Sequence, residues 1–446
     1  MERYKEYKDS CVQWIGEIPQ HWALRRIKYI FSELKGKSVN GLETPLSLSK
    51  DWGIIPFNEK KNKTMESASY IGGKIVHKGE IVFNRFKARL FAVSGYDGIV
   101  SSDYAVYKCN KTASPEYMVK LFGTDIYREA FNRKASGIGD GFSRLYTDDL
   151  FAMYSIFPPF HEQEKIVTFI ERKTSKIDEY IAEKEKEVQL LNELKEAEIA
   201  KAVTQGLNPN VKMKDSGVSW IGMIPEHWEI KRIASLFTGK VNTNSDFAYQ
   251  HAFKFNYGTL VPKDEVGDAE EYRETYVKYQ VLQKDDILIN GLNLNYDFVS
   301  QRVAIAPSDG IITSAYIVAR PRKGTNADYY NFLFKAMDSK KLFHGMGTGI
   351  RLTLSFDELK KQIVECPPID EQQAIVAYIN EKTAKVESLI TDLQAEIEHL
   401  KEYKQRLIAD CVTGQVNVAG SESRGGLLTM PSQSNVTKSN VQNETI

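Results

Sequence analysis

The stretch WIGEIPQHW, residues 14–22, decides the fold because it returns almost unchanged as WIGMIPEHW at residues 220–228. Extended upstream, residues 8–22 and 214–228 are identical at eleven of fifteen positions. A repeat this far apart is too long for a solenoid, whose repeats span a few tens of residues. The phrase therefore marks the start of each copy of a duplicated, domain-sized unit.

A second pair of segments closes each copy. Residues 158–181 read PPFHEQEKIVTFIERKTSKIDEYI, and residues 367–390 read PPIDEQQAIVAYINEKTAKVESLI. Both continue into tracts rich in Glu, Lys and Leu, which favour helix. The predicted order along the chain is a first globular domain over 1–157, a long helix over 158–206, a second globular domain over 207–366, a second long helix over 367–416 and a polar, disordered tail over 417–446.

The region between phrase and helix reads as mixed α/β in both copies. Short β-rich runs such as GEIVFNRF (79–86) and DDILING (285–291) are bounded by Gly and Asp. GIVSSDYAVYK (98–108) aligns with GIITSAYIVAR (310–320), although most of the remaining sequence has diverged. The two domains are therefore predicted to share one frame and to differ on their surfaces.

The two long tracts carry an apolar stripe. From Ile375 to Leu407, eight of ten positions at strict 4–3 spacing are apolar, and six of ten are apolar at the aligned positions 166–198. Such a seam is typical of coiled coils. The tracts are predicted to pack on each other antiparallel as rods of about 64 Å, from about 43 residues at 1.5 Å each. The predicted fold class is α+β: two pseudo-repeated mixed α/β domains separated by two long helices forming an antiparallel coiled coil.

Charge is partitioned along the chain although the formal net charge is zero. Residues 23–157 hold 21 Lys and Arg against 14 Asp and Glu, whereas residues 229–366 hold 18 against 17. A basic first domain suits a polyanionic partner. The four cysteines lie far apart with no CxxC pair, and no apolar run approaches the length of a membrane span, so we expect a reduced, cytoplasmic protein without a metal site.

Paired W-I-G-x-I-P-x-H-W phrases, each followed by a variable region and a P-P-x-x-E-Q helix, resemble the DNA-specificity (S) subunits of type I restriction–modification systems. The resemblance covers about residues 8–415. It implies two target-recognition domains that each read half of a bipartite double-stranded DNA target. It also implies docking of two adenine-N6 methyltransferase subunits and, in the full complex, motor/endonuclease subunits. The subunit itself would be non-catalytic and need no cofactor.

Several strings imitate catalytic motifs. FPPF (157–160) and CPPI (366–369) lack the polar first residue that an adenine methyltransferase motif needs, and fit better as rigid starts to the helices, with Glu162 and Glu371 favoured by the helix dipole. The matched His21 and His227 are predicted to be structural, because no acid or cysteine recurs beside both at ligand spacing. We therefore predict no catalytic residue and no metal ligand.

DNA contacts are predicted at two aligned places in each domain. GIGDG (137–141) and GMGTG (345–349) are flexible turns or loops that approach phosphates, each followed by an arginine. Amide and guanidinium side chains able to read base edges cluster after one strong strand per domain, although each alone could be a solvated loop residue. The candidates are Asn84, Arg85, Lys87, Arg89 and Arg144 in the first domain, and Asn290, Asn293, Asn295, Tyr296, Gln301, Arg302 and Arg351 in the second.

Three other interpretations compete with a DNA-binding assembly module. A single-chain restriction or methylation enzyme would need an S-adenosylmethionine loop with a catalytic Asn-Pro-Pro-aromatic string, or a nuclease triad, and the sequence offers no convincing instance. A coiled-coil scaffold without DNA specificity leaves two divergent domains on a repeated frame unexplained. A specificity subunit whose partner fuses methylase and nuclease remains an alternative that this sequence does not separate from the leading one.

Overall fold

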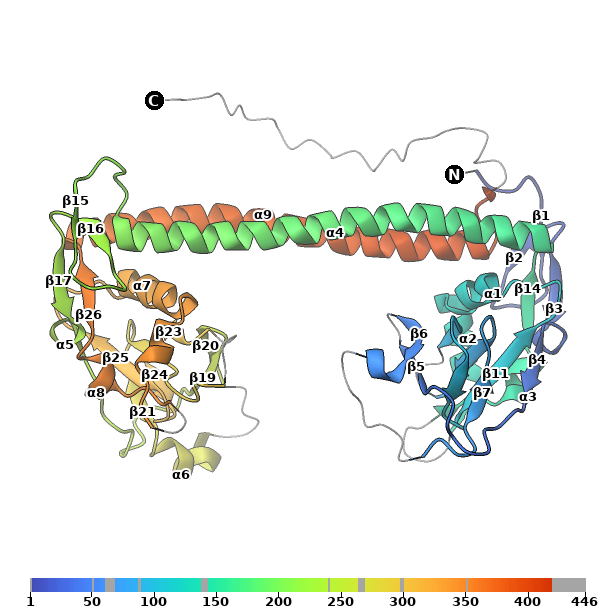
Figure 1. Cartoon of the computed structure of the whole chain (residues 1–446), viewed down its shortest axis with the longest axis horizontal. Helices are drawn as coiled ribbons and strands as arrows, with labels where there is room; N and C mark the ends of the chain where they lie inside the picture. The colour runs from blue at the N-terminus through green and yellow to red at the C-terminus, as the bar shows by residue number, and fades with distance from the viewer. Residues whose placement is uncertain are drawn as a thin grey trace. The chain divides into compact units, whose positions relative to one another are not determined.

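The computed structural model describes residues 2–49, 52–60, 69–86, 90–137, 143–239, 241–263, 269–296, 301–349 and 352–418 (Figure 1). The chain divides into two compact units: unit 1 is Met1–Glu183 with Glu396–Ile446, and unit 2 is Lys184–Ala395. Each unit therefore combines one globular region with one end of each of two long helices, α4 (Phe160–Gln205) and α9 (Ile369–Val412).

Unit 1 carries a four-stranded antiparallel sheet in the order β4-β11-β8-β9. Its other strands form the two-stranded pairs β1-β2, β5-β6, β7-β10, β3-β14 and β12-β13. Its strands are β1 (Tyr7–Asp9), β2 (Glu17–Pro19), β3 (Ala23–Arg26), β4 (Phe31–Leu34), β5 (Leu46–Ser49), β6 (Gly53–Pro56), β7 (Lys74–Val76), β8 (Ile81–Asn84), β9 (Phe91–Val93), β10 (Gly98–Val100), β11 (Tyr104–Cys109), β12 (Ser136–Gly137), β13 (Ser143–Arg144) and β14 (Tyr154–Phe157). Its shorter helices are η1 (Ile27–Tyr29), η2 (Phe57–Glu59), α1 (Pro115–Phe122), α2 (Asp125–Lys134) and α3 (Thr147–Ala152).

Unit 2 repeats this topology with its own four-stranded sheet, β18-β25-β22-β23. Its strands are β15 (Met213–Asp215), β16 (Met223–Pro225), β17 (Glu229–Arg232), β18 (Phe237–Thr238), β19 (Phe253–Asn256), β20 (Thr259–Pro262), β21 (Gln280–Leu282), β22 (Ile287–Ile289), β23 (Val303–Ile305), β24 (Gly310–Ile312), β25 (Ile317–Pro321) and β26 (Ile363–Cys366). Its shorter helices are α5 (Ile233–Leu236), η3 (Ala269–Tyr272), α6 (Arg273–Tyr276), α7 (Ala327–Ser339), η4 (Leu342–Gly345) and α8 (Phe356–Leu359).

The repeat extends to the register of single bridges. The bridge between Lys37 and Lys74 in unit 1 has an exact counterpart in unit 2 between Thr243 and Gln280, each residue 206 positions later. The pairs β3-β14 and β17-β26 likewise join the strand after each repeated phrase to the strand before each diproline. The two globular regions are therefore copies of one frame, as the sequence predicts.

The long helices run antiparallel within each unit. In unit 1, Asp178 of α4 pairs with Lys404 Nζ of α9 at 2.6 Å, and two residues later Tyr180 donates to Glu396 at 3.2 Å. In unit 2, Lys195 Nζ lies 3.5 Å from Glu387 Oε1. Lys195 and Lys404 are 209 positions apart, and so are Asp178 and Glu387. The ion pairs therefore follow the same repeat as the sequence. The predicted fold class is confirmed.

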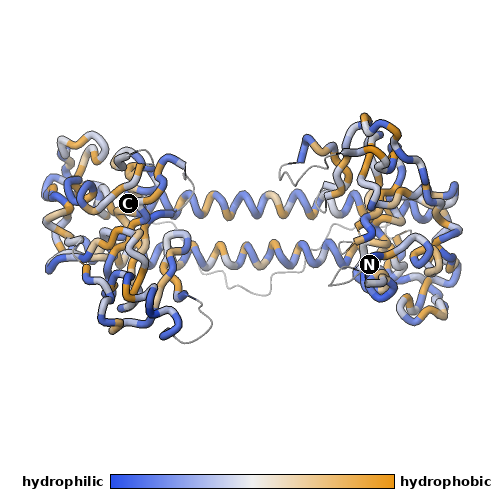
Figure 2. The backbone as a smooth tube through the Cα atoms, turned by 90° about the horizontal axis from the view of Figure 1, so that it is seen from below, coloured by the Kyte–Doolittle hydropathy of each residue, from blue (hydrophilic) through white to orange (hydrophobic). Residues whose placement is uncertain are grey.

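The apolar stripe on the helices differs in detail from the predicted 4–3 seam. Figure 2 shows apolar positions recurring along both helices. Leu389 and Tyr403, predicted in the seam, are 53% and 40% exposed, whereas Ile390 and Ile397 are buried. An α-helix drifts by about 20° per heptad relative to a strict 3.5-residue repeat, so the buried face passes to the next residue. The strict spacing is therefore wrong in the middle of α9.

Candidate nucleic-acid interface

The residues shared by both phrases build the base of each unit. The glutamate of each P-P-x-x-E-Q string accepts from the histidine of the repeated phrase: His21 Nε2 lies 2.9 Å from Glu162, and His227 Nε2 lies 2.7 Å from Glu371. Trp228 Nε1 donates to the same Glu371 at 3.0 Å. The histidines thus occupy structural positions that join each phrase to a long helix.

The glutamine of the same string holds the start of a shorter helix that comes earlier in each unit, α1 or α7. Gln163 Oε1 accepts from the amide of Ser114, the N-cap of α1, at 2.9 Å, while its amide group donates to the Pro158 carbonyl at 2.8 Å. In unit 2, Gln372 makes the same two kinds of hydrogen bond, to the N-cap Asn326 and to Pro367. The first proline of each diproline is thus hydrogen-bonded to the first turn of a long helix.

A buried tyrosine brings the end of the other long helix into each unit. Tyr117 donates to the carbonyl of Val412, and Tyr329 donates to the carbonyl of Val203, both at 2.7 Å. The sequence analysis does not predict the roles of these tyrosines and glutamines. Each residue recurs at the aligned position of the second copy, and this recurrence is the feature of the sequence that could have identified them.

In each unit the structure brings together the two places predicted to contact DNA. The Leu145 amide donates to the Arg85 carbonyl at 3.0 Å, and at the aligned positions the Leu354 amide donates to the Gly291 carbonyl at 2.9 Å. The loop after β8 or β22 thus lies against the segment that follows the glycine-rich string. In unit 2, a Cβ on Gly347 would lie 2.9 Å from Leu294, so glycine permits this close approach.

Arg144 lies where these two segments of unit 1 meet, beside Phe86. Its guanidinium lies over the rings of Phe86 and Tyr146, 4.9 and 5.7 Å from their centroids. Its Nη2 lies 3.1 Å from Asp103 Oδ1. A cation on an aromatic platform that stays partly exposed is suited to phosphate or base contact.

The loop after β22 presents side chains outward around one buried anchor. Leu294 is fully buried, and its amide donates to the Leu352 carbonyl at 3.2 Å. On either side, Asn293 is exposed with a φ of 52°, and Tyr296 is 76% exposed. Asparagine tolerates this left-handed conformation better than most residues. An exposed amide and an exposed ring on a pinned loop can meet base edges.

The other candidates divide by position. Gln301 is exposed, Asn295 is half-buried, and Asn84 and Asn290 accept backbone amides within their own turns at 2.9 and 3.1 Å. Arg302 is 0% exposed, and the half-buried Arg85 side chain, 14% exposed, turns toward Glu33. The guanidiniums of these two candidates donate to protein groups, Glu33 for Arg85 and loop carbonyls for Arg302. Lys87, Arg89 and Arg351 lie outside the described residues, as do residues 138–142.

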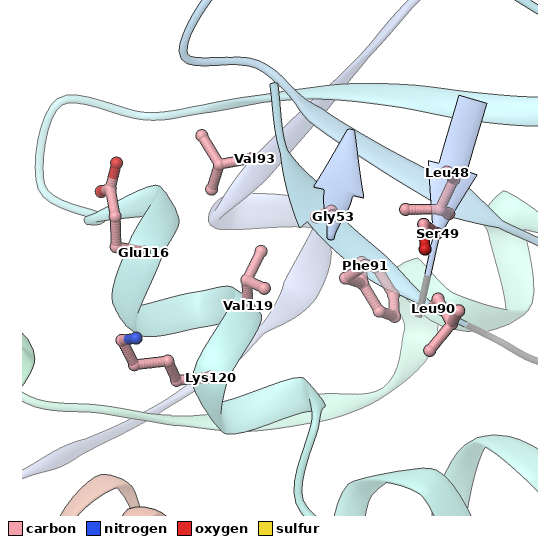
Figure 3. A pocket seen from close by; sticks show the side chains of 10 residues that line it. Leu48, Ser49, Gly53, Leu90, Phe91, Val93, Glu116, Val119 and Lys120 are labelled. Atoms are coloured by element: carbon pink, nitrogen blue, oxygen red, sulfur yellow. The ribbon is translucent and has the colours of Figure 1, made fainter. Parts of the chain in front are cut away.

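Unit 1 has a pocket lined by residues of α1, β9 and the β5-β6 hairpin. It measures about 290 Å³ and lies between α1 and the β5-β6 hairpin (Figure 3). Leu48, Phe91 and Val119 supply apolar walls, with Glu116 and Lys120 at the edge. Glu116 lies 3.3 Å from the hydroxyl of Ser114, the N-cap of α1, so it has a structural partner. This lining offers no pair of acids or nucleophile with a base.

Within the described ranges, no three His, Cys, Asp or Glu side chains are grouped to hold a metal ion. No helix in those ranges is long and apolar enough to cross a membrane.

Comparison with known proteins bears on the same frame. The sequence profile described as "Type I restriction modification DNA specificity domain" matches residues 225–399. A protein of Methanocaldococcus jannaschii, named as the MjaX specificity subunit of a type I restriction enzyme, is 22% identical over 442 residues, which are 94% of this chain and 99% of its own length. Residues 225–399 thus match the type I DNA-specificity domain, and the chain as a whole is similar to a type I specificity subunit along nearly its full length.

Further likenesses agree with the type I specificity family. The MjaVIII specificity subunit of the same organism is 24% identical over 285 residues, 58% of this chain and 61% of its own length. A solved chain from work on assembly and conformational transition of the type I R-M system overlays with a TM-score of 0.64 at 16% identity, over 90% of this chain and 99% of that chain. At this identity the overlay concerns the fold alone.

Proposed function

We propose that this specificity subunit reads a bipartite double-stranded DNA target, one half with each unit, through the loops after β8 and β22 and the segments that lie against them. The observation that carries the proposal is divergence at one point of a shared frame. Between β8 and β9 the chain has six residues, and between the aligned β22 and β23 it has thirteen. A conserved frame with different loops is how one fold reads different sequences.

The subunit is proposed to be non-catalytic, cytoplasmic and free of cofactors. It would dock two adenine-N6 methyltransferase subunits and, in the full restriction enzyme, motor/endonuclease subunits. The repeated base of each unit supports two methyltransferase sites, because the phrase and both helix ends recur there with the same hydrogen bonds. Native mass spectrometry of the assembled complex would contradict this by giving a saturated one-to-one complex. A partner that fuses methylase and nuclease is the alternative.

Asn293→Gly is expected to weaken discrimination at one base pair of the half-site read by unit 2. Glycine retains the positive φ while removing the amide that would pair with a base edge. Loss of a bidentate base contact costs about 1–3 kcal/mol. The measurement is kcat/KM for methylation by the assembled complex, on the target and on targets substituted at each position.

The matched control is Asn208→Gly, an exposed asparagine of the same unit beside the end of α4, which should leave all rates unchanged. An equal loss on every DNA sequence, with a smaller salt dependence, would show that Asn293 contacts phosphate instead.

A further inference from the structure

Two arginines, Arg85 half-buried and Arg302 fully buried, lie at opposite ends of the loops proposed to read DNA. We define the unit 1 loop as residues 84–90, of which 84–86 and 90 are described, and the unit 2 loop as residues 290–302, of which 290–296, 301 and 302 are described. Arg85 is near the start of the first loop, and Arg302 is the last residue of the second. Both guanidiniums point into the protein instead of toward solvent.

In unit 1 the half-buried guanidinium of Arg85 pairs with a carboxylate of the sheet. Arg85 Nη2 donates to Glu33 Oε1 of β4 at 2.6 Å and to the Thr147 hydroxyl at 3.3 Å. Lys74 Nζ lies 3.6 Å from the same Glu33 oxygen, and the hydroxyl of Tyr107 lies 3.1 Å from that of Thr147. These contacts fix the start of the loop to β4 and to the first turn of α3.

Unit 2 has no room for the same pair. The strand registers align Glu33 with Gly239 and Arg85 with Gly291. A Cβ on Gly239 would lie 2.3 Å from the ring of Phe356, and a Cβ on Gly291 would lie 2.3 Å from the Leu354 carbonyl oxygen. Phe356 stands 209 positions after Thr147, so an aromatic ring occupies the place of the unit 1 ion pair.

Unit 2 instead holds its loop from the other end. Arg302 Nη1 donates to the carbonyls of Asn290 and Leu292 at 3.0 and 2.8 Å, so the last residue of the loop is tied to its first turn. The Arg302 amide donates to Asp338 Oδ2 of α7 at 2.7 Å. The aligned residue before β9 in unit 1 is Leu90, which has no such donors.

Burial of a guanidinium is costly unless its hydrogen bonds are satisfied inside the protein. A leucine serves at the Arg302 position in unit 1, so the frame does not require the charge there. What the guanidinium adds is a planar group whose Nη1 holds two loop carbonyls at once. Its contacts are to the loop, and its function is expected to concern the loop.

We propose that Arg85 and Arg302 are positioning residues, which set the shape of the DNA-reading loop of their own unit without touching a base. The two units hold their loops differently. In unit 1 the start of the loop is bonded to the sheet, and in unit 2 the end of the loop is bonded to its start. The inference rests on the proposed function, because it assigns to these loops the reading of one half-site each.

The test replaces each arginine with methionine, which keeps an unbranched apolar stem and removes every donor. Hydrogen exchange on the full-length Arg302→Met chain should show amides of residues 290–296 exchanging about tenfold faster or more, with β22 and β25 unchanged. In the assembled methylating complex, Arg302→Met should lower discrimination by about tenfold at the half-site of unit 2 alone. Arg85→Met should do so at the other half-site alone.

Arg302→Lys is the conservative variant. A single ammonium retains the charge but lacks the planar fork, so it should restore discrimination only in part. Should the methionine variant fail to fold, the lysine variant decides the question with the same two measurements.

Unchanged exchange in residues 290–296 would overturn the positioning role, whatever happens on DNA. An equal loss at both half-sites would also overturn it, because it would indicate general destabilisation. Faster loop exchange with both half-sites read normally would show that Arg302 holds the loop but does not affect specificity. It would also overturn the assignment of base reading to that loop.

Discussion

Trp228→Ala is expected to lower the free energy of unfolding of unit 2 by about 3–5 kcal/mol, the range for a large aromatic side chain removed from a core. Trp228 is 0% exposed, and it packs with Val203 from the end of α4 and Ile375 from the start of α9 in the main core of unit 2. Its removal also takes away the indole donor to Glu371. One residue thus joins the repeated phrase to both long helices.

Native-state hydrogen exchange of the β22 amides measures this loss in unit 2 specifically. Trp52→Ala provides the control, because Trp52 is 69% exposed and its loss should change stability by less than about 0.5 kcal/mol. A loss below about 1 kcal/mol for Trp228→Ala would contradict the account of the repeated phrase as the base of the unit.

Glu365→Gln is expected to stabilise unit 2 by up to about 3 kcal/mol above pH 7 and to change little near pH 4.5. Glu365 lies on β26, is 0% exposed, and neither carboxylate oxygen has a hydrogen-bond partner among the described residues. Burial raises its pKa from 4.5 to about 7. One pKa unit corresponds to 1.36 kcal/mol, so a shift of this size amounts to about 3 kcal/mol.

The sign follows from proton uptake on folding. Because the folded pKa of Glu365 is the higher one, the folded state holds the proton when the unfolded state has lost it, and stability falls as pH rises from about 4.5 to about 7. Glutamine keeps the shape and cannot ionise, so the variant should lose this slope.

Urea denaturation between pH 4.5 and 8 follows the effect, with Glu274→Gln, which removes an exposed carboxylate of unit 2, as the control. Parallel stability curves for Glu365→Gln and the parent chain would refute the assignment.

The sequence predicts the fold well because the domain is duplicated, and residues that the fold requires recur in both copies. The phrases, the diprolines and the 98–108 and 310–320 segments recur at nearly fixed offsets, and the topology recurs with them. The drift of the helical stripe was missed because Leu389 and Ile390 are both apolar, and only the partner helix decides which is buried.

The candidate site was predicted less well for a physical reason. Position after a strand identifies a loop, and so the predicted clusters of each domain do lie together. Residue type does not reveal which groups a side chain contacts: Arg144 lies over aromatic rings, while Arg85 and Arg302 turn to Glu33 and to loop carbonyls. The acceptors that decide this come from distant parts of the chain.

The central claim is that the two halves of the target are read independently by two copies of one frame. The direct measurement is methylome sequencing with a chain whose residues 23–157 are replaced by the equivalent region of another specificity subunit. That exchange carries Glu33, Arg85 and Thr147 together, so the loop keeps its own anchor. The account predicts that one half-site changes and the other is preserved. A simultaneous change of both half-sites would contradict it.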